Sequence, residues 1–268
     1  MLIALHARKS AGAIERSARL HKDVPIIVAL TGTDLYGDLH TAPAVVESLQ
    51  RATRIVALQG AAARELPAAL RSRIRVIHQS VIAPTDHPPP REDIFEVCVI
   101  GNLRDVKDPF LCADAVRLLP AASRVHVVHL GAALTERMRR RAQVETSTNP
   151  RYEWIGPQPR TSAIRTLAAC RLMVLTSKME GGANVISESV ACGVPVLSSR
   201  IPGSVGLLGA EYPGFFPVGD AAALATMLHR TETDGVFLRE LTVRGTAIAP
   251  LLLPDREKQS WAELLREL

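Results

Sequence analysis

The sequence predicts an α/β protein made of two doubly wound domains with parallel sheets. Short apolar runs alternate with helix-like segments along the chain, and a proline-rich segment divides this alternation into two series. Strand–helix alternation implies parallel pairing with right-handed crossovers. A Gly-Gly pair between a buried strand and a helix start, at residues 181–182, predicts a ligand site beyond the carboxyl ends of the strands of the second series.

The first series runs from residue 1 to residue 82 and contains four predicted strands and three predicted helices. The strands are Leu2–His6, Pro25–Leu30, Arg54–Gln59 and Ile74–His78, and the helices are Ser10–Leu20, Ala44–Arg51 and Ala61–Leu70. This lobe has few strands for a doubly wound domain and lacks an opening Gly-rich turn. We therefore expect it to be incomplete, beginning inside a domain.

Residues 83–94 are predicted to be a semi-rigid linker, because four prolines fall within residues 84–90. The second series, residues 95–250, has strands at Phe95–Ile100, Arg124–Leu130, Tyr152–Ile155, Leu172–Thr176, Val194–Ser198 and Phe215–Val218. Its helices are predicted at Phe110–Leu119, Thr135–Val144, Ser162–Cys170, Val185–Cys192 and Asp220–His229. We expect a C-terminal helix within residues 251–268, beginning near Arg256, to pack back across both domains.

The composition excludes several classes of protein. The chain has 268 residues, of which 47% are hydrophobic and 22% charged, as in ordinary globular proteins. A pI of about 9.3 and the run Arg139–Arg141 indicate solvated helix faces, attraction of anionic substrates, or contact with a membrane surface, which we do not favour. No nucleic-acid motif is found. No apolar run is long enough to span a membrane, and no signal-peptide pattern opens the chain.

The four cysteines, Cys98, Cys112, Cys170 and Cys192, lie in apolar strand or helix contexts and form no Cys-x-x-Cys pair. They are typical of reduced core residues in a cytoplasmic protein.

The segment from Glu180 to Glu188 is the main candidate site. Its glycines would let a ligand approach the backbone, and the start of the following helix offers free N–H groups to an anion. Glu188 falls about one turn into that helix, where it would accept hydrogen bonds from hydroxyls, and Glu180 projects from the loop. A phosphate between two such carboxylates predicts a nucleotide-sugar; the alternative is a plain turn with two surface acids.

A second candidate segment, Gly101-Asn102-Leu103-Arg104-Asp105-Val106-Lys107, follows the first strand of the second domain. Arg104 and Lys107 are three residues apart, so both cations would reach one anion. Fixed positive charge in a dry cleft would stabilise a departing diphosphate. Two exposed loop cations are the alternative interpretation.

Two segments of the first domain end strands on the side of the predicted cleft. One contains Thr31, Gly32, Thr33 and Asp34, whose alternative role is a helix N-cap. The other contains His6, Arg8 and Lys9, where two cations beside a helix start predict an anion site for the acceptor. His6 is a candidate general base or a structural residue. The segment Ser199–Gly206 is predicted to be a tight loop beneath the donor phosphates, or a plain turn.

The spacing Glu180 to Glu188 resembles the E-x7-E signature of retaining family-four glycosyltransferases of the GT-B fold, which has two Rossmann-like domains. The resemblance implies that Glu188 holds the ribose of UDP and that Glu180 contacts the donor sugar. It also implies that Gly181, Gly182, Ala183, Asn184 and Val185 face the diphosphate and sugar, with Gly101 and Asn102 on the donor side. Arg104 and Lys107 match the family's basic pair, which neutralises the leaving diphosphate. Thr31 stands where the family has a histidine.

A narrower resemblance is to the selenosugar synthases of selenoneine biosynthesis. It rests on segments such as Leu5–Arg8, Leu30–Tyr36, His129–Leu134, Met179–Ala183 and Arg200–Gly206. It implies transfer of a glucosyl or N-acetylglucosaminyl unit from a UDP-sugar to selenophosphate. An acceptor that is already anionic needs little general-base help, which suits Thr31 in place of the histidine.

No Asp-x-Asp pair occurs, so we expect neither a metal ion nor a cofactor beyond the sugar donor. Two other functions stay open: a family-four hexosyltransferase acting on a sugar or lipid acceptor, and a truncated, non-catalytic binder of sugar nucleotides.

Overall fold

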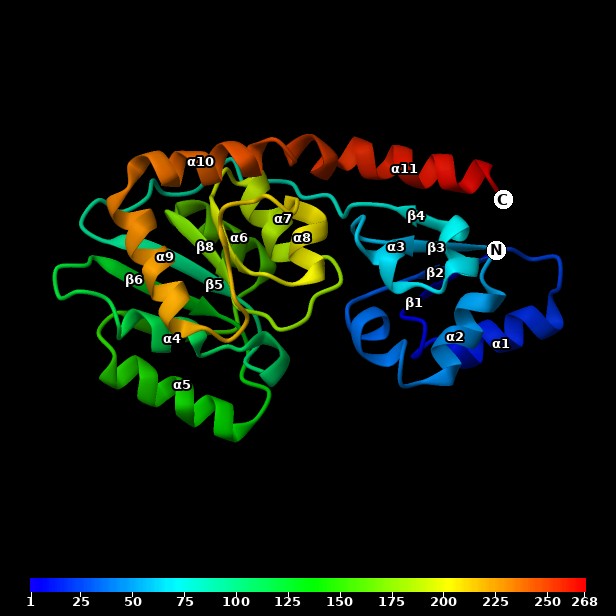
Figure 1. The fold of residues 1–268 in the computed structure, drawn as a ribbon, viewed down its shortest axis with the longest axis horizontal. Coiled ribbons are helices and arrows are strands. Elements are labelled where there is room, and N and C mark those ends of the chain that lie inside the picture. Colours follow the sequence, from blue (N-terminus) through cyan, green and yellow to red (C-terminus); the bar gives the residue numbers. More distant parts are fainter.

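A computed structural model describes residues 1–268, and in it the chain forms two parallel sheets (Figure 1). The first sheet has the order β1-β2-β3-β4 and the second has the order β10-β9-β8-β5-β6-β7. We call the first sheet with its helices the N-terminal lobe and the second the C-terminal lobe. The predicted α/β fold with parallel sheets is confirmed.

In the N-terminal lobe every strand pairs in parallel with the next strand along the chain. Its elements are β1 (Leu2–Leu5), α1 (Ala11–Leu20), β2 (Ile26–Ala29), the π-helix η1 (Asp34–Asp38), α2 (Pro43–Arg51), β3 (Arg54–Ala57), α3 (Ala62–Glu65), the 3-10 helix η2 (Ala68–Arg73) and β4 (Ile74–Val76). Residues alternate between the two faces of β2, since Ile26 and Val28 join the core under α1 and α2 while Ile27 and Ala29 face the other side.

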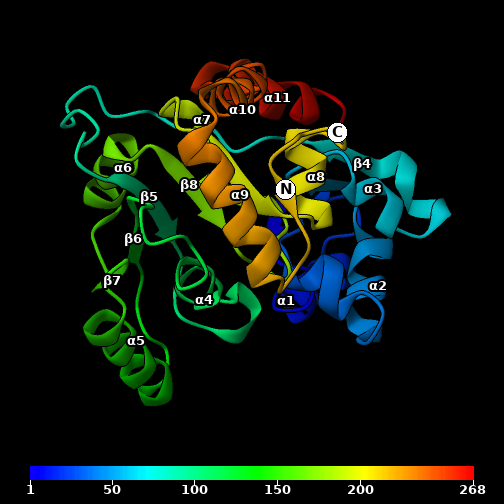
Figure 2. The same cartoon turned by 60° about the vertical axis from the view of Figure 1, so that its left-hand side comes forward.

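The C-terminal lobe is the larger one. It contains β5 (Phe95–Ile100), η3 (Asp105–Lys107), α4 (Leu111–Val116), β6 (Val125–Leu130), α5 (Glu136–Thr148), β7 (Tyr152–Gly156), α6 (Arg160–Ala169), β8 (Leu172–Leu175), α7 (Asn184–Ala191), β9 (Val196–Ser199), α8 (Pro202–Leu208), β10 (Phe215–Phe216), α9 (Ala221–Thr233) and α10 (Gly235–Thr246). β5 and β8 lie at the centre of the sheet, while β7 forms one edge with α5 beside it (Figure 2). The carboxyl ends of β5 and β8 therefore lie at the middle of this sheet.

The chain crosses between the lobes twice on the same side. The segment after β4 leads into the C-terminal lobe, and the 3-10 helix η4 (Ala249–Leu252) and α11 (Pro254–Arg266) lead back along the upper edge of Figure 1. The two crossings touch, because the N–H of Val81 donates to the carbonyl of Leu252 at 3.0 Å.

Helix α11 covers the face of the N-terminal sheet that α1 and α2 leave open. Leu264 is buried in a small core with Ile27, Ala29, Val56 and Ile77, and Trp261 packs against it. The last turn is also held by charge, since Glu267 accepts from Arg54 Nε at 3.0 Å and pairs with Arg75 Nη2 at 2.6 Å.

Several predicted elements differ from those observed. The helix expected over Ala61–Leu70 is broken into α3 and η2, because Pro67 has no N–H to donate and its ring clashes with a preceding helical turn. The loop expected over Ser199–Gly206 is mostly α8, which Pro202 opens at a position where a missing N–H costs nothing. Helix α10 was not predicted, although Asp234 caps it by accepting from the N–H groups of Val236 and Phe237.

No helix of the chain has both the length and the apolar character that a membrane crossing requires. All four cysteines are free thiols.

Candidate functional site

A cavity of about 320 Å³ lies between the lobes, at the carboxyl ends of β5 and β8. Its lining comes from both lobes: Thr31, Gly32, Leu58 and Gln79 on one side, and Lys107 and Glu180–Val185 on the other. The candidate segments of the two domains are therefore brought together as the topology predicts, since parallel strands end at one edge of their sheet.

Lys107 and Glu180 form an ion pair in this cavity, through Nζ and Oε1. The same Oε1 accepts a hydrogen bond from Ser177 Oγ at 2.6 Å, whereas Oε2 has no hydrogen-bond partner. Both charged side chains are mostly buried. Glu180 thus uses one oxygen for internal contacts and presents the other to the cavity.

The end of β8 holds both members of this pair in place. Thr176 Oγ1 donates to the carbonyl of Lys107 at 2.8 Å, and the N–H of Lys178 donates to the carbonyl of Val106 at 2.9 Å. The carbonyl of Ser177 accepts from Ser199 Oγ at 2.5 Å. Because Thr176, Ser177 and Ser199 are buried, their hydrogen bonds fix the loop and the cation together.

The glycines of the motif allow close contact between the lobes. A β-carbon on Gly181 would lie 2.5 Å from the carbonyl oxygen of Thr31, and one on Gly32 would lie 2.7 Å from the Gly181 nitrogen. A β-carbon on Gly182 would collide with the Leu58 side chain. The N-terminal lobe therefore approaches the backbone of these glycines, and the expectation that they also let a ligand approach it stays a prediction.

The glycines of α8 also allow close contacts between segments. A β-carbon on Gly203 would collide with the carbonyl oxygen of Glu180, and one on Gly206 would collide with Gln59 Oε1. Gln59 is fully buried and donates to the Tyr36 hydroxyl at 2.6 Å. These glycines thus allow close contacts with Glu180 and Gln59. The segment Ser199–Gly206 is mostly helix and not the predicted loop, while its place beneath the donor phosphates stays a prediction.

Glu188 lies in a second cavity, of about 340 Å³, which Gln79, Ser80, Val81, Arg160, Asn184, Ser187, Glu188 and Glu257 line. Gln79 and Asn184 line both cavities, so the two are neighbours. Arg160 donates from Nε and Nη2 to Glu188 Oε1 at 3.3 and 3.1 Å. Burial raises the pKa of Glu188 above its usual value, while the Arg160 charge acts in the opposite direction.

Of the remaining donor-side residues, Gly101 and Asn102 are held by hydrogen bonds, whereas Arg104 is exposed. Gly101 accepts from His129 Nε2 at 3.0 Å through its carbonyl, and Asn102 Oδ1 accepts from the N–H of Ala132 at 2.9 Å. Arg104 is exposed, makes no hydrogen bond or ion pair through its side chain, and lines neither cavity. The predicted pairing of Arg104 with Lys107 around one anion is therefore not found in this conformation.

On the N-terminal side, Asp34 has a structural role and joins two strand ends by hydrogen bonds. It is fully buried and accepts from the N–H of Ala7 at 2.9 Å, and from the N–H and hydroxyl of Thr31 at 2.8 and 2.9 Å. His6, whose φ is +68°, lies beside it with Nδ1 3.7 Å from Asp34 Oδ2. These contacts fix the Thr31–Gly32 backbone that meets Gly181.

His6 Nδ1 accepts from the N–H of Lys9 at 3.4 Å, so Nε2 carries the hydrogen that is donated to Thr33 Oγ1 at 3.0 Å. Arg8 pairs with Asp38 at 2.8 Å, and neither Arg8 nor Lys9 lines the cavity. The anion site expected from these two cations is not assembled here, because Asp38 already neutralises Arg8.

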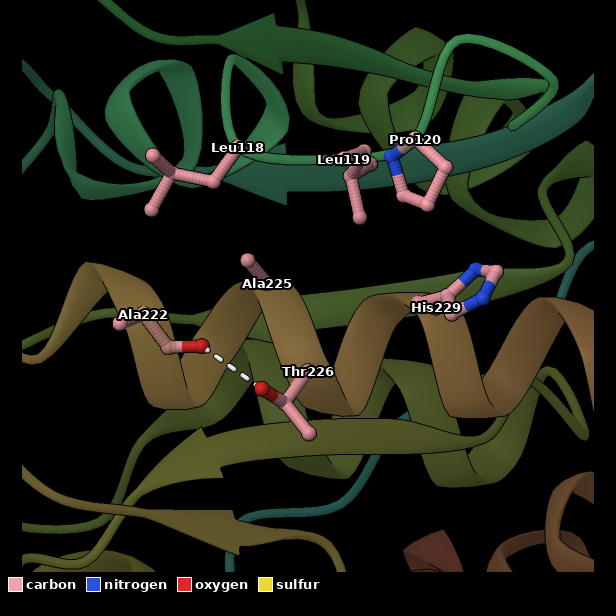
Figure 3. A pocket seen from close by; sticks show the side chains of 7 residues that line it. All are labelled: Leu118, Leu119, Pro120, Ala222, Ala225, Thr226 and His229. Carbon is pink, nitrogen blue, oxygen red and sulfur yellow. Dashed lines mark hydrogen bonds between the residues drawn. The ribbon is translucent and has the colours of Figure 1, made fainter.

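A third cavity, of about 350 Å³, lies away from the lobe contact (Figure 3). Leu118, Leu119 and Pro120 form one side of it and Ala222, Ala225, Thr226 and His229 on α9 form the other. The Thr226 hydroxyl is satisfied within its own helix by the Ala222 carbonyl. This cavity has an apolar lining and no carboxylate or ammonium group, unlike the two at the lobe contact.

The sequence interpretation missed Ser177, Gln79, Arg160 and Glu257. Ser177 was detectable in principle, because it follows the buried strand directly. The others come from the segment after β4, from α6 and from α11 and carry no local signal. No group of three His, Cys, Asp or Glu side chains is arranged to hold a metal ion, and the expectation that the protein needs neither a metal nor a cofactor stays a prediction.

Comparisons with known proteins agree with this architecture. Residues 86–245, more than half of the chain, match the family described as glycosyl transferases group 1. Among solved structures, Anabaena Alr3699/HepE in complex with UDP and glucose superposes with a TM-score of 0.82 at 18% identity, over 99% of this chain and 78% of that one. Sucrose-phosphate synthase from Thermosynechococcus elongatus gives 0.77 at 17% identity, over 99% and 72%.

The S. aureus TarM G117R mutant, in complex with Fondaparinux, alpha-GlcNAc-glycerol and UDP, gives a TM-score of 0.73 at 14% identity. The match covers 98% of this chain and 55% of that one. At these identities the likeness concerns the fold, which is GT-B.

Proposed function

Because the chain belongs to the glycosyl transferases group 1 family, we propose that it transfers a glucosyl or N-acetylglucosaminyl unit from a UDP-sugar to selenophosphate. The carbon–selenium bond forms as the bond between the anomeric carbon and the diphosphate breaks, and UDP leaves with the electron pair. No metal or cofactor takes part in this proposal.

The arrangement of Glu180 and Glu188 is the observation that supports binding of a UDP-sugar donor. Each carboxylate is tied through Oε1 to a cation, and each keeps Oε2 without a hydrogen-bond partner beside a cavity. Such oxygens accept hydrogen bonds from sugar and ribose hydroxyls. Similar structures were determined with UDP, and in one case with UDP-glucose.

Lys107 is the cation best placed to stabilise the departing diphosphate, because it is the one cationic side chain that lines the cavity beside Glu180. A fixed charge in a cleft that excludes water acts strongly on charge that develops in the transition state. We propose that Arg104 joins it only if its loop rearranges around the ligand.

The acceptor of this proposal would enter the cavity beside Glu180. The lobes touch at Thr31 and Gly181 and again at Leu58 and Gly182, so about 320 Å³ is left beside Glu180 for a hexose and its acceptor. His6, Arg8, Lys9 and Thr33 do not line the cavity, so we propose Thr31, Gly32 and Gln79 for the acceptor side.

The test is release of UDP from UDP-N-acetylglucosamine, and from UDP-glucose, with and without selenophosphate. We expect selenophosphate to accelerate release, and orthophosphate, as the matched anion without selenium, to have no effect. Mass spectrometry of the product should detect a hexosyl–selenium species. Release driven only by a sugar or lipid acceptor would identify an ordinary hexosyltransferase, and UDP binding without turnover would identify a non-catalytic binder.

A further inference from the structure

The cavity around Glu188 contains a cation that the donor motif does not include. Arg160 begins α6 and reaches across to α7, where two of its nitrogens lie 3.1 and 3.3 Å from Glu188 Oε1. The Glu188 side chain is 10% exposed, whereas the Arg160 side chain is 70% exposed. The carboxylate is therefore mostly buried, whereas its cationic partner is largely exposed and reaches it from the surface.

Each of the two carboxylates of the site is held by one cation. Lys107 holds Glu180 through Oε1, and Arg160 holds Glu188 through Oε1, and in both residues Oε2 makes no hydrogen bond. A carboxylate held on one side by a charged donor has its plane and its free oxygen oriented before the ligand arrives, which lowers the entropy lost on binding.

We propose that Arg160 is a positioning residue for the nucleoside half of the donor: it keeps Glu188 ionised and turns its free oxygen toward the ribose hydroxyls. This inference rests on the proposed function. It adds a residue outside the Glu180–Glu188 segment, contributed by another helix, that sets how strongly the ribose is recognised.

The electrostatic surroundings of Glu188 make such a partner necessary. Burial raises the pKa of this carboxyl, and Arg160 is the cation that opposes the rise. Glu257, from α11, is the other charged residue that lines the cavity, and it adds negative charge while accepting from the N–H of Ser80 at 2.8 Å. Just past the end of α7, burial raises the pKa of Cys192 to about 11, and the negative charge of Glu188 acts in the same direction.

Removal of Arg160 should therefore leave a carboxyl that protonates at higher pH. A neutral carboxyl accepts hydrogen bonds from hydroxyls more weakly than a carboxylate. Binding of the nucleotide should then depend on pH in the variant more steeply than in the wild type, and it should depend less on the ribose hydroxyls.

The experiment is calorimetric binding of UDP and of 2′-deoxy-UDP between pH 5.5 and pH 8. For Arg160→Ala we expect binding of UDP about threefold weaker at pH 8, as for a partly exposed ion pair. The ratio of the Kd values of variant and wild type should grow about tenfold further toward pH 5.5. Taking this ratio at each pH cancels the titration of the phosphates of UDP itself. The preference for UDP over 2′-deoxy-UDP should narrow.

Arg160→Lys should restore most of the pH profile, because a cation remains near Oε1. Arg165→Ala is the matched control, since Arg165 lies on the same helix but pairs with Asp86 instead. If wild type binds UDP and Arg160→Ala changes neither the pH profile nor the 2′-hydroxyl preference, the positioning role is wrong while the proposed function stands. If wild type binds no UDP, the proposed function fails and this inference fails with it.

Discussion

The α-carbon of Gly181 lies so close to Thr31 that a β-carbon there would stand 2.5 Å from the Thr31 carbonyl oxygen. Thr31 belongs to the N-terminal lobe and Gly181 to the loop that carries Glu180. The two segments are 150 positions apart in the sequence, and they form one wall of the candidate active site. The geometry of this contact thus controls both the closure of the lobes and the position of the carboxylate.

Gly181→Ala should push the lobes apart. We expect a loss of about 1–3 kcal/mol in the free energy of unfolding, as for other overpacked contacts, and a large fall in transferase activity. Urea denaturation and the radius of gyration from solution scattering measure the two effects. Gly12→Ala is the control, because a β-carbon at Gly12 meets nothing within 4 Å; within α1 it should stabilise by up to about 1 kcal/mol. If the two variants had the same free energy of unfolding and the same radius of gyration, the close contact between Gly181 and Thr31 would be wrong.

Lys107→Met should be far more damaging than Arg104→Met. Lys107 lines the cavity and holds Glu180, whereas Arg104 is exposed and has no partner. Removing one electrostatic stabiliser of a developing charge typically lowers kcat by about 10²–10³-fold, and we expect that loss for Lys107→Met. Less than a tenfold loss is expected for Arg104→Met. Steady-state UDP release measures both, and the reverse ranking would mean that the donor moves Arg104 into the site.

Leu264→Ala should detach the C-terminal helix from the N-terminal sheet. Leu264 is 1% exposed among side chains of β2 and β3, so its truncation should lower the free energy of unfolding by about 2–5 kcal/mol. Its neighbour Leu265 is 42% exposed, and Leu265→Ala should change stability little. Chemical denaturation of both variants, with proteolysis to detect a loosened α11, provides the comparison. Similar losses in both would show that α11 does not dock through Leu264.

His129 should make the stability of the fold depend on pH. Burial lowers the pKa of this imidazole to about 4, while an unfolded histidine titrates near its usual value of about 6.5. Because the folded pKa is depressed, the contribution of neutral His129 is complete above pH ~6.5 and is lost progressively as the pH falls toward ~4. A shift of this size corresponds to about 3 kcal/mol.

The check is the free energy of unfolding of wild type and His129→Gln at pH 7, 5.5 and 4.5. The variant loses the hydrogen bonds to Gly101 and Tyr152 and should be less stable at pH 7, but its stability should fall less steeply with acid. If the free energy of unfolding fell equally with acid in both proteins, groups other than His129 would be responsible for the acid sensitivity.

The sequence determined much of the C-terminal lobe. Its strands are apolar runs flanked by glycines and polar residues, and Glu180 and Glu188 are close in the chain, so local spacing was enough to predict a strand, a Gly-rich turn and a helix. The family described as glycosyl transferases group 1 matches this same part of the chain. Predictions failed where one residue changed the outcome. A predicted helix is broken at Pro67 and a predicted loop becomes a helix at Pro202, because a single missing N–H ends or begins a helix.

Only the tertiary structure decided which side chains meet across the lobes. Arg104 and Lys107 looked equivalent by spacing, yet Lys107 lines the cavity while Arg104 is exposed to solvent. Arg8 looked free, yet Asp38 holds it. Arg160 and Glu257 carried no local signal and reach Glu188 from separate elements. The physical reason is that periodicity reports only which face of an element is buried, whereas partners of charged groups depend on how distant elements pack.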